Sequence, residues 1–359
     1  MDKSILGIGT VSAMGCGIES LRQGLSGNAF PNILAHHIET KEGTFTLPVY
    51  RAVAEGLENY IERSRLRRMD PFLRMGLLAS CLAMQDSGLE IDDGERVGIV
   101  FGTGYGALAS SFGSFNSLME DGDNCVSPTL FATSVHNAMA SNVSIALGLG
   151  GPLQTVSSFE MTTWAVFDLA CGWIDEGIVD YVLTGVGDEY CPTRGYSVLL
   201  SGARGMTAMN PLDFSCCTYL PGEGFSAFLI GKGQGYCRIS ATERVAASHF
   251  SGKGMDALFL SANGEKEMAA AYSRCMKESS RIAAYAPLYG GLPVGQGFDL
   301  AVAALSLKEG TLYPSPSVFP AVADKRVICK KEKFGNPFTI GTVQCDRDGN
   351  GGVVELSSP

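Results

Sequence analysis

The sequence is short of the residues that metal sites, disulfide scaffolds and nucleic-acid surfaces require. It has four His in 359 residues, and its 11 Cys form no C-x-x-C pair, so no metal site is expected. Cys stand mostly alone in apolar runs, where a thiol acts as a small buried hydrophobe. The adjacent Cys216 and Cys217 are interpreted as packing neighbours, and all the thiols as reduced.

Basic charge and long apolar segments are also scarce. The net charge of −10 disfavours nucleic acid and anionic membranes as partners. No stretch approaches the ~18 consecutive apolar residues of a transmembrane helix. The first residues, MDKSILGIGTVSAMG, contain no A-x-A cleavage pattern, so no signal peptide is expected and the cytoplasm is the predicted location.

What is abundant indicates a well-buried α/β protein. Hydrophobic residues make up 45% of the chain, and 45 Gly suit tight turns between strands and helices. Apolar strand-like runs alternate with helical periodicity through residue 230, and more thinly afterwards. The run 70–88 is typical of a helix, with Asp70 at the N-cap, Pro71 at the first position and Gly88 at the end. We predict two related α/β halves, 1–230 and 231–359, that share one core.

Two local motifs point to a site only weakly when taken alone. The GTGYG turn at 102–106 lacks the third Gly and the later acid of a dinucleotide loop, so a nucleotide site is not expected. Arg63, Arg65, Arg67 and Arg68, with Arg74 beyond them, form a basic cluster in an acidic chain, which by itself indicates a solvated helix face.

The segment 151–189 resembles the nucleophile region of β-ketoacyl synthases. That family reads G-P-x-x-T-V-x-T-A-C-S-S, then a helix, then D-x-x-x-x-G-G-x-E. The matching residues are Gly151, Pro152, Thr155, Val156, Gly177, Asp180, Gly185, Gly187 and Glu189. RRMDPFLRMGLLAS, NPLDFSCCTYLPGEG and DGNGGVVEL resemble three further family motifs, in the same order along the chain.

The resemblance implies a thiolase-like fold, in which two duplicated halves form five α-β-α-β-α layers and two subunits usually form a dimer. It implies no cofactor beyond the phosphopantetheine arm of an acyl carrier protein, which carries the substrate.

The resemblance also implies that the catalytic Cys-His-His set is absent. Glu160 aligns with the nucleophilic Cys, which in the family lies on a strained turn at a helix N-terminus. Asn263 aligns with the first His, and Gly290 or Gly291 with the second. The family's pocket-gating Phe aligns with Asn350. Phe159 and His136 are the other residues expected at the acyl pocket.

Alternatives remain for several of these residues. Glu160 is either an acid that merely suits a helix N-terminus or a functional charge in the pocket. His136 and Asn137 are favoured as local hydrogen-bonding residues, and Cys171 as a core residue. In the family, basic residues before the matching helix dock the acidic carrier protein, which gives Arg63, Arg65, Arg67 and Arg68 a second interpretation.

Three functions follow as hypotheses. The leading one is a non-condensing partner, similar to a chain-length factor, that pairs with an active ketosynthase in fatty-acid or polyketide synthesis. The second is an acyl-thioester enzyme with altered chemistry at Glu160, a decarboxylase or an acyltransferase. The third is a homodimeric scaffold that binds an acyl carrier protein.

Overall fold

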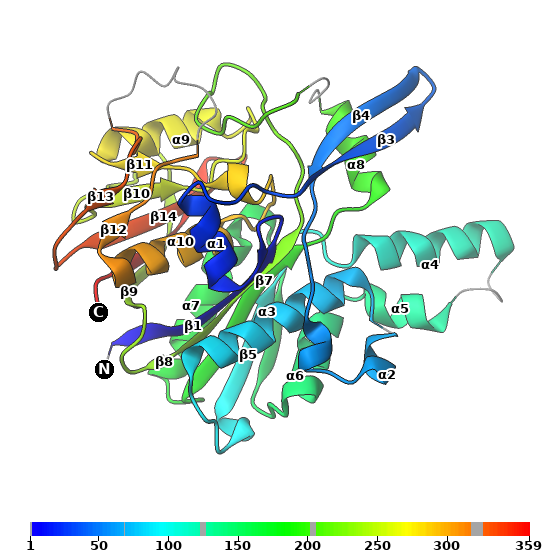
Figure 1. Ribbon diagram of the computed structural model, residues 1–359, viewed down its shortest axis with the longest axis horizontal. Helices are drawn as coiled ribbons and strands as arrows, with labels where there is room; N and C mark the ends of the chain where they lie inside the picture. The colour runs from blue at the N-terminus through cyan, green and yellow to red at the C-terminus, as the bar shows by residue number, and fades with distance from the viewer. Residues whose placement is uncertain (1, 68, 123–126, 202–205, 317–325) are drawn as a thin grey trace.

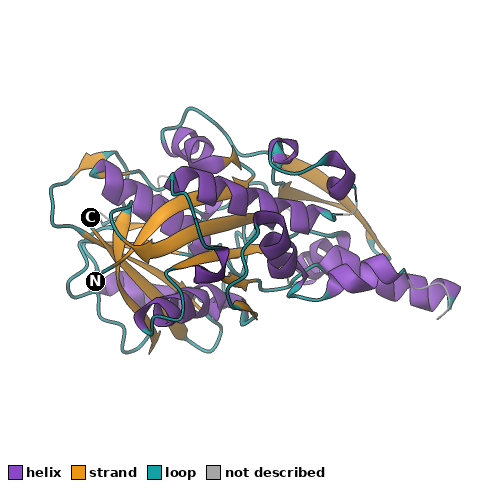
Figure 2. Ribbon diagram, turned by 90° about the horizontal axis from the view of Figure 1, so that it is seen from below, coloured by secondary structure: helices purple, strands orange, loops and turns teal. Residues whose placement is uncertain are grey.

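A computed structural model describes residues 2–67, 69–122, 127–201, 206–316 and 326–359 of the chain. Strands form a large central sheet with helices on both sides, and a pair of helices projects from the body (Figures 1 and 2). Both termini lie on the side away from this projecting pair (Figure 1). None of the helices in the described ranges is long and apolar enough to cross a bilayer.

The strands are β1 (Lys3–Ser12), β2 (Gly15–Cys16), β3 (Ile33–Thr40), β4 (Gly43–Tyr50), β5 (Val97–Gly102), β6 (Leu153–Val156), β7 (Tyr181–Asp188), β8 (Gly224–Lys232), β9 (Cys237–Ala246), β10 (Ala257–Leu260), β11 (Ile282–Ala283), β12 (Thr311–Leu312), β13 (Glu332–Lys333), β14 (Thr339–Cys345) and β15 (Asn350–Ser357). The α-helices are α1 (Gly17–Leu25), α2 (Arg63–Leu66), α3 (Pro71–Ser87), α4 (Leu108–Asp121), α5 (Pro128–Ser134), α6 (Ala138–Leu147), α7 (Thr162–Asp175), α8 (Pro192–Leu200), α9 (Ala269–Cys275) and α10 (Gln296–Glu309). Single turns of 3-10 helix are η1 (Leu57–Asn59), η2 (Gly94–Arg96), η4 (Phe159–Met161), η5 (Met276–Glu278) and η6 (Ala286–Leu288).

The strand order shows that the fold is duplicated. The spatial order in the first half is β1-β8-β7-β5-β6, and in the second half β9-β15-β14-β10-β11. If β1, β5, β6, β7 and β8 are matched with β9, β10, β11, β14 and β15, the two orders coincide. The strand directions coincide as well, with β5 parallel to β6 and β7, and β10 parallel to β11 and β14. This arrangement confirms the predicted duplicated α/β fold; the division at residue 230 itself stays a prediction.

The two halves join through strands and through a shared helical layer. β1 and β9 pair at two positions, Ser4 with Arg238 and Ile5 with Cys237, which makes one continuous sheet. Helix α7 contacts β5 and β7 of its own half and β9 and β15 of the other, while α10 contacts strands of both halves in the same way. Residues 296–307 of α10 are all buried, as expected for a helix with apolar residues on every side.

Helix α3 covers the outer face of the first half and follows the predicted boundaries. The Asp70 carboxylate accepts a hydrogen bond from the Leu73 N–H at 2.7 Å, and Gly88 ends the helix with φ of 62°. The helix lies so close to β1 that a Cβ on Gly9 would be 2.0 Å from the Ala79 carbonyl oxygen. The glycine in this strand therefore permits the close packing of helix on sheet.

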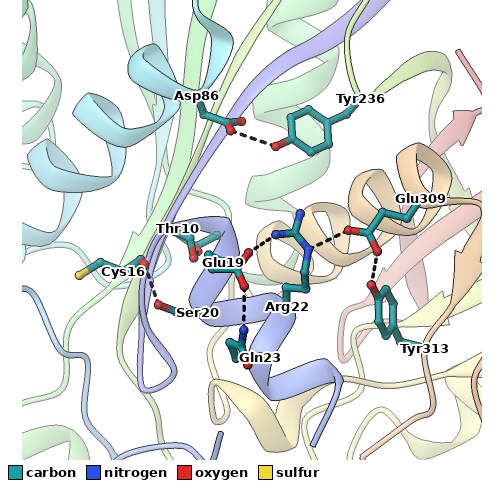
Figure 3. Close-up of polar contacts among 11 residues, drawn as sticks. Thr10, Cys16, Glu19, Ser20, Arg22, Gln23, Asp86, Tyr236, Glu309 and Tyr313 are labelled. Atoms are coloured by element: carbon teal, nitrogen blue, oxygen red, sulfur yellow. Dashed lines mark hydrogen bonds and ion pairs between the residues drawn. The ribbon is translucent and has the colours of Figure 1, made fainter. Parts of the chain in front are cut away.

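Figure 3 shows polar contacts that connect α1 with the second half. Arg22 pairs with Glu19 in its own helix, and its Nε donates to Glu309 at the end of α10 over 2.7 Å. Glu309 also accepts a hydrogen bond from the Tyr313 hydroxyl. Because these side chains are partly exposed, the ion pairs are expected to add little to stability beyond fixing the orientation of α1.

The carboxyl ends of the parallel strands carry Glu160 and Asn263, which the sequence analysis selected, and two residues that it did not, Tyr105 and Arg347. Tyr105 follows β5, Glu160 follows β6, Asn263 follows β10, and Arg347 follows β14. Crevices beyond the carboxyl ends of strands are the usual binding sites of α/β folds. The candidate site is therefore sought there.

Candidate functional site around Glu160

Glu160 lies in the single turn η4, directly before helix α7. The preceding residue, Phe159, has a φ of 44°, which is costly for a bulky side chain. The Ser158 N–H donates to the Thr162 hydroxyl at 2.8 Å and closes the turn. A strained turn was expected at Glu160, and the strain in the structure lies at Phe159, one residue earlier.

Both acidic and basic groups surround the half-buried Glu160 carboxylate. Burial raises the pKa of Glu160, its own backbone N–H and the Arg347 and Arg194 guanidiniums oppose that rise, and Asp346 adds to it. The nearby Glu265 is also buried, which raises its pKa, and its Oε2 lies 3.6 Å from Nη2 of Arg347. Glu160 and Glu265 thus share two guanidiniums as counterions.

Asn263, at the position aligned with the first His, shapes the turn after β10. Its side-chain oxygen accepts a hydrogen bond from the Glu265 N–H at 3.1 Å, and the residue is buried. Gly264 follows with φ of 86°, and its carbonyl accepts from the Thr218 N–H at 2.9 Å. Asn263 therefore orients the segment that carries Glu265 toward Glu160.

Neither position aligned with the second His has room for a side chain. A Cβ on Gly291 would lie 2.2 Å from the ring of Tyr219, whose hydroxyl donates to the Gly291 carbonyl at 2.9 Å. A Cβ on Gly290 would lie 2.7 Å both from Cβ of Tyr50 and from Cα of Gly222. The ring of Tyr219 fills this space, and sequence reasoning did not identify Tyr219.

Arg194, in the first turn of α8, is a second residue that sequence reasoning missed. Its guanidinium carbon lies 4.5 Å from the ring centre of Tyr105 and 5.6 Å from that of Tyr219. Its Nη2 donates to the Tyr219 hydroxyl at 2.9 Å. The Tyr105 ring in turn meets the Phe159 ring edge to face, with centroids 5.7 Å apart. Aromatic and guanidinium groups therefore run without a break from Phe159 to Gly291.

Asp188, at the end of β7, holds the turn that carries Tyr105. Its carboxylate accepts hydrogen bonds from the Thr103 hydroxyl at 2.6 Å and from the Tyr105 N–H at 2.8 Å. Burial raises the pKa of Asp188 to about 6, against these hydrogen bonds. The neighbouring Glu189, part of the family-like motif, accepts from the Ala109 N–H at 2.6 Å at the start of α4, and burial raises its pKa to about 7.

The three expected pocket residues all lie near this cluster. Phe159 is 54% exposed. Asn350 binds Asp346, with its Nδ2 donating to the carboxylate at 2.8 Å, in the turn that also carries Arg347. His136 is exposed, and its ring borders Gly106, next to Tyr105. The structure thus brings them to one region without showing a chemical role for any of them.

The basic cluster lies on exposed chain just before α3. Arg63, Arg65 and Arg67 are exposed on and after α2 and pair with no carboxylate of the described residues. Arg68 lies outside the described residues. Arg74 donates to the carbonyls of Leu66 and Met69 and so fixes α2 against α3.

Two other expectations concern a substitute thiol nucleophile and a metal ion. Cys171 is buried in α7, and burial raises the pKa of its thiol to about 12, so it is almost entirely un-ionised at neutral pH. In the described ranges no group of His, Cys, Asp and Glu side chains could hold a metal ion.

A model of the β-ketoacyl synthase N-terminal domain matches residues 7–237. The chain belongs to the β-ketoacyl synthase family. The 3-oxoacyl-[acyl-carrier-protein] synthase 2 of Vibrio cholerae is 28% identical over 189 residues, which are 52% of this chain and 45% of that protein. The match thus spans about half the length of this relative.

Solved ketosynthase structures share the fold over the whole chain. A ketosynthase in complex with its chain length factor from Xenorhabdus doucetiae superposes with a TM-score of 0.82 at 14% identity, covering 100% of this chain and 98% of that chain. A type II polyketide synthase acyl carrier protein in complex with its ketosynthase gives 0.79 at 14% identity, covering 100% of this chain and 99% of that one. These likenesses confirm the thiolase-like fold expected from the sequence motifs.

Proposed function

We propose that this protein is a non-condensing partner of an active ketosynthase, similar to a chain-length factor. The observation that carries the proposal is the closed space at Gly290 and Gly291, where Tyr219 and Tyr50 exclude a His side chain. A substitution of one residue can arise by chance, whereas packing that fills the vacated space indicates a site adapted to the loss.

The chemistry available at Glu160 agrees with this assignment. A carboxylate is a weak nucleophile toward a thioester, and an ionised Glu160 would repel the carboxylate of a malonyl group. Asn263 and the glycines offer no imidazole at the aligned positions to stabilise the charge that develops in condensation.

An unpaired sheet edge and exposed apolar side chains support a partner of the same fold. β6 is the edge strand of its half, so no strand of the described residues pairs with the other side of its backbone. Nearby helices α4, α5 and α6 expose Phe115, Met119, Phe131 and Ile145, and Figure 1 shows α4 and α5 projecting from the body. Exposed apolar residues in such number are typical of an interface.

The partner-binding test mixes this chain with a complete ketosynthase from the same organism, and one encoded beside this chain would be the first choice. We expect a one-to-one complex in analytical ultracentrifugation, and Phe131→Asp should weaken it at least tenfold. Leu89→Asp is the matched control. Leu89 is also an exposed apolar residue, but it lies just beyond the C-terminal end of α3 and outside α4, α5 and α6. A chain that forms only homodimers would support the scaffold hypothesis and contradict the heterodimer.

The raised pKa of Glu160 favours one alternative, an acyl-thioester enzyme that uses this carboxyl group. A carboxyl group that titrates closer to neutral pH can act as a general acid or base. The isolated chain is incubated with malonyl and acyl carrier proteins, and released carbon dioxide and intact mass are measured. Turnover or an adduct that disappears in Glu160→Gln would replace the proposal, and no turnover in either protein is the expected result.

Carrier-protein docking is the remaining part of the proposal. Arg63, Arg65 and Arg67 have no acidic partner among the described residues, so their charges are available to an acidic protein. The hydrogen bond of Ser110 to Asp70 at 3.0 Å places the start of α3 beside the start of α4. The basic cluster therefore lies on the side of the molecule where the Tyr105 turn leads into α4.

A further inference from the structure

Arg194 lies between the rings of Tyr105 and Tyr219, an arrangement that the sequence did not predict. α8 begins at Pro192, and its first turn points Arg194 between Tyr105 and Tyr219. A Cβ on the next residue, Gly195, would lie 2.1 Å from the Tyr190 hydroxyl, so this turn is packed tightly against Tyr190. The backbone of α8 therefore has little freedom to withdraw Arg194.

The contacts of Arg194 hold its side chain in place without a direct ion pair to a described residue. Its guanidinium lies over the faces of two phenol rings. It also donates hydrogen bonds to the Tyr219 hydroxyl and, at 3.4 Å, to the Ser197 hydroxyl. No carboxylate among the described residues lies within 4.0 Å of it. Stacking on aromatic faces orients the planar group, because the ring quadrupole attracts the cation.

The walls behind the guanidinium are aromatic. Tyr105 presents its face to Arg194, its edge region meets Phe159, and Tyr219 closes the far side against Gly291. Removing the atoms of Arg194 beyond Cβ would vacate the volume that the guanidinium now fills between the rings of Tyr105 and Tyr219. Such a lining suits an unbranched acyl chain, whereas a charged group left inside it would have to be desolvated against that chain.

We propose that Arg194 is the specificity-determining residue that closes this chain's own acyl space. The inference rests on the proposed function, because a partner that helps to shape a ketosynthase's cavity has no need of an open pocket of its own. Arg194 fills the space by volume and by charge, and Tyr219 holds it there.

The test measures binding of octanoyl-N-acetylcysteamine to the purified chain by isothermal titration calorimetry. We expect no measurable binding to the wild type and at least a tenfold gain in affinity for Arg194→Ala. Arg194→Met should remain closed, because Met retains most of the volume without the charge. Arg51→Ala is the matched control: Arg51 also lies over a tyrosine ring, that of Tyr190 at 5.5 Å, and its removal should create no binding.

Each outcome decides the point. Wild-type binding as tight as that of Arg194→Ala, or no gain in a folded Arg194→Ala, overturns the proposal, and Arg194→Val serves as a second opening variant if the alanine variant does not fold. Binding gained by Arg194→Met would show that charge alone excludes the acyl chain and would overturn the volume argument. Because the assay uses this chain alone, a missing ketosynthase complex would contradict the proposed function and leave this result intact.

Discussion

The buried carboxyl group of Asp299 gives the protein a pH-dependent stability that can be worked out from the structure. Asp299 lies in α10 and is fully buried. The Tyr289 hydroxyl donates to its Oδ1 at 2.9 Å, and Oδ2 is buried with no hydrogen-bond partner among the described residues. Burial raises the pKa of Asp299 from its ordinary 3.8 to about 7. The folded protein therefore holds this proton where the unfolded chain releases it.

The sign and size of the effect follow from this difference in pKa. Stability is greatest below the unfolded pKa and falls as the pH rises toward the folded pKa, because the unfolded state ionises first. Between the two pKa values, each pH unit lowers the free energy of unfolding by about 1.4 kcal/mol, so ionisation of Asp299 lowers it by at most about 4 kcal/mol in total. Asp299→Asn keeps an acceptor for Tyr289 and has no charge to release. The free energy of unfolding of the variant should equal that of the wild type near pH 4 and be larger than that of the wild type above pH 7.

The assay is urea unfolding at several pH values between 5 and 8. The quantity of interest is the difference in free energy of unfolding between Asp299→Asn and the wild type, since Asp188 and Glu189 contribute the same slope to both proteins. We expect this difference to grow by about 2–3 kcal/mol across the range. Asp180→Asn is the control, because Asp180 is exposed and its Arg96 hydrogen bond lowers its pKa. A difference that stays constant with pH would refute the reasoning.

Three further predictions test packing, capping and charge. Gly291→Ala should lower the free energy of unfolding by about 1–3 kcal/mol because its Cβ meets the Tyr219 ring, whereas Gly172→Ala in α7, with open space at its Cβ, should raise it by up to about 1 kcal/mol in the same urea titration. Asp70→Ala should cost about 1 kcal/mol in thermal unfolding through loss of the α3 cap. Arg67→Glu should weaken binding of an acidic carrier protein in a salt-dependent way, and binding that is insensitive to salt and to this change would exclude docking there.

The elements that the sequence predicted are those whose local signals agree with their packing. The run 70–88 became α3 with the expected cap and end, because N-cap chemistry and the terminal glycine act within a few residues. Helix α10 coincides with a long, largely apolar run that ends at Gly310. The run EKEMAAAYSRCMKESS at 265–280 is typical of a helix over its whole length, yet α9 covers only Ala269–Cys275 and a 3-10 turn follows it.

The elements that sequence reasoning missed have weak local signals and strong tertiary ones. The β3–β4 hairpin has few apolar residues in β3 and is largely exposed there. Helix α4 is rich in Ser, Gly and Asn, which favour turns over helices. Strand β14 begins in the segment 320–342, whose mixed composition has no clear period, yet it pairs with β10 and β15 in the centre of its half. Only the neighbouring strands define it.

The residues of the candidate site also differ in whether local sequence signals or tertiary contacts identify them. Glu160 and Asn263 were found because sequence motifs surround them, and the structure brings both to one cluster through Glu265. Arg194 lies in no recognisable motif, and Tyr219, although it lies within the family-like segment 210–224, was not singled out there. Their positions depend on how α8 and the segment before β8 pack against the Tyr105 turn. A contact between segments that are distant in sequence leaves no periodic pattern, so it could not be predicted from one sequence.

Under the proposed function, the packing at Gly291 also determines whether substitutions at the three aligned catalytic positions could give this chain condensation activity. Glu160→Cys and Asn263→His each alter a turn that already holds a polar side chain, so both can be accommodated. A His at Gly291 cannot, because Tyr219 occupies its space and at the same time binds the Gly291 carbonyl and Arg194. The triple variant should therefore fold poorly and condense nothing, and shrinking Tyr219 would release Arg194. Under the proposed function, the loss of the catalytic set would therefore be a property of the packing at Gly291 as well as of three residues.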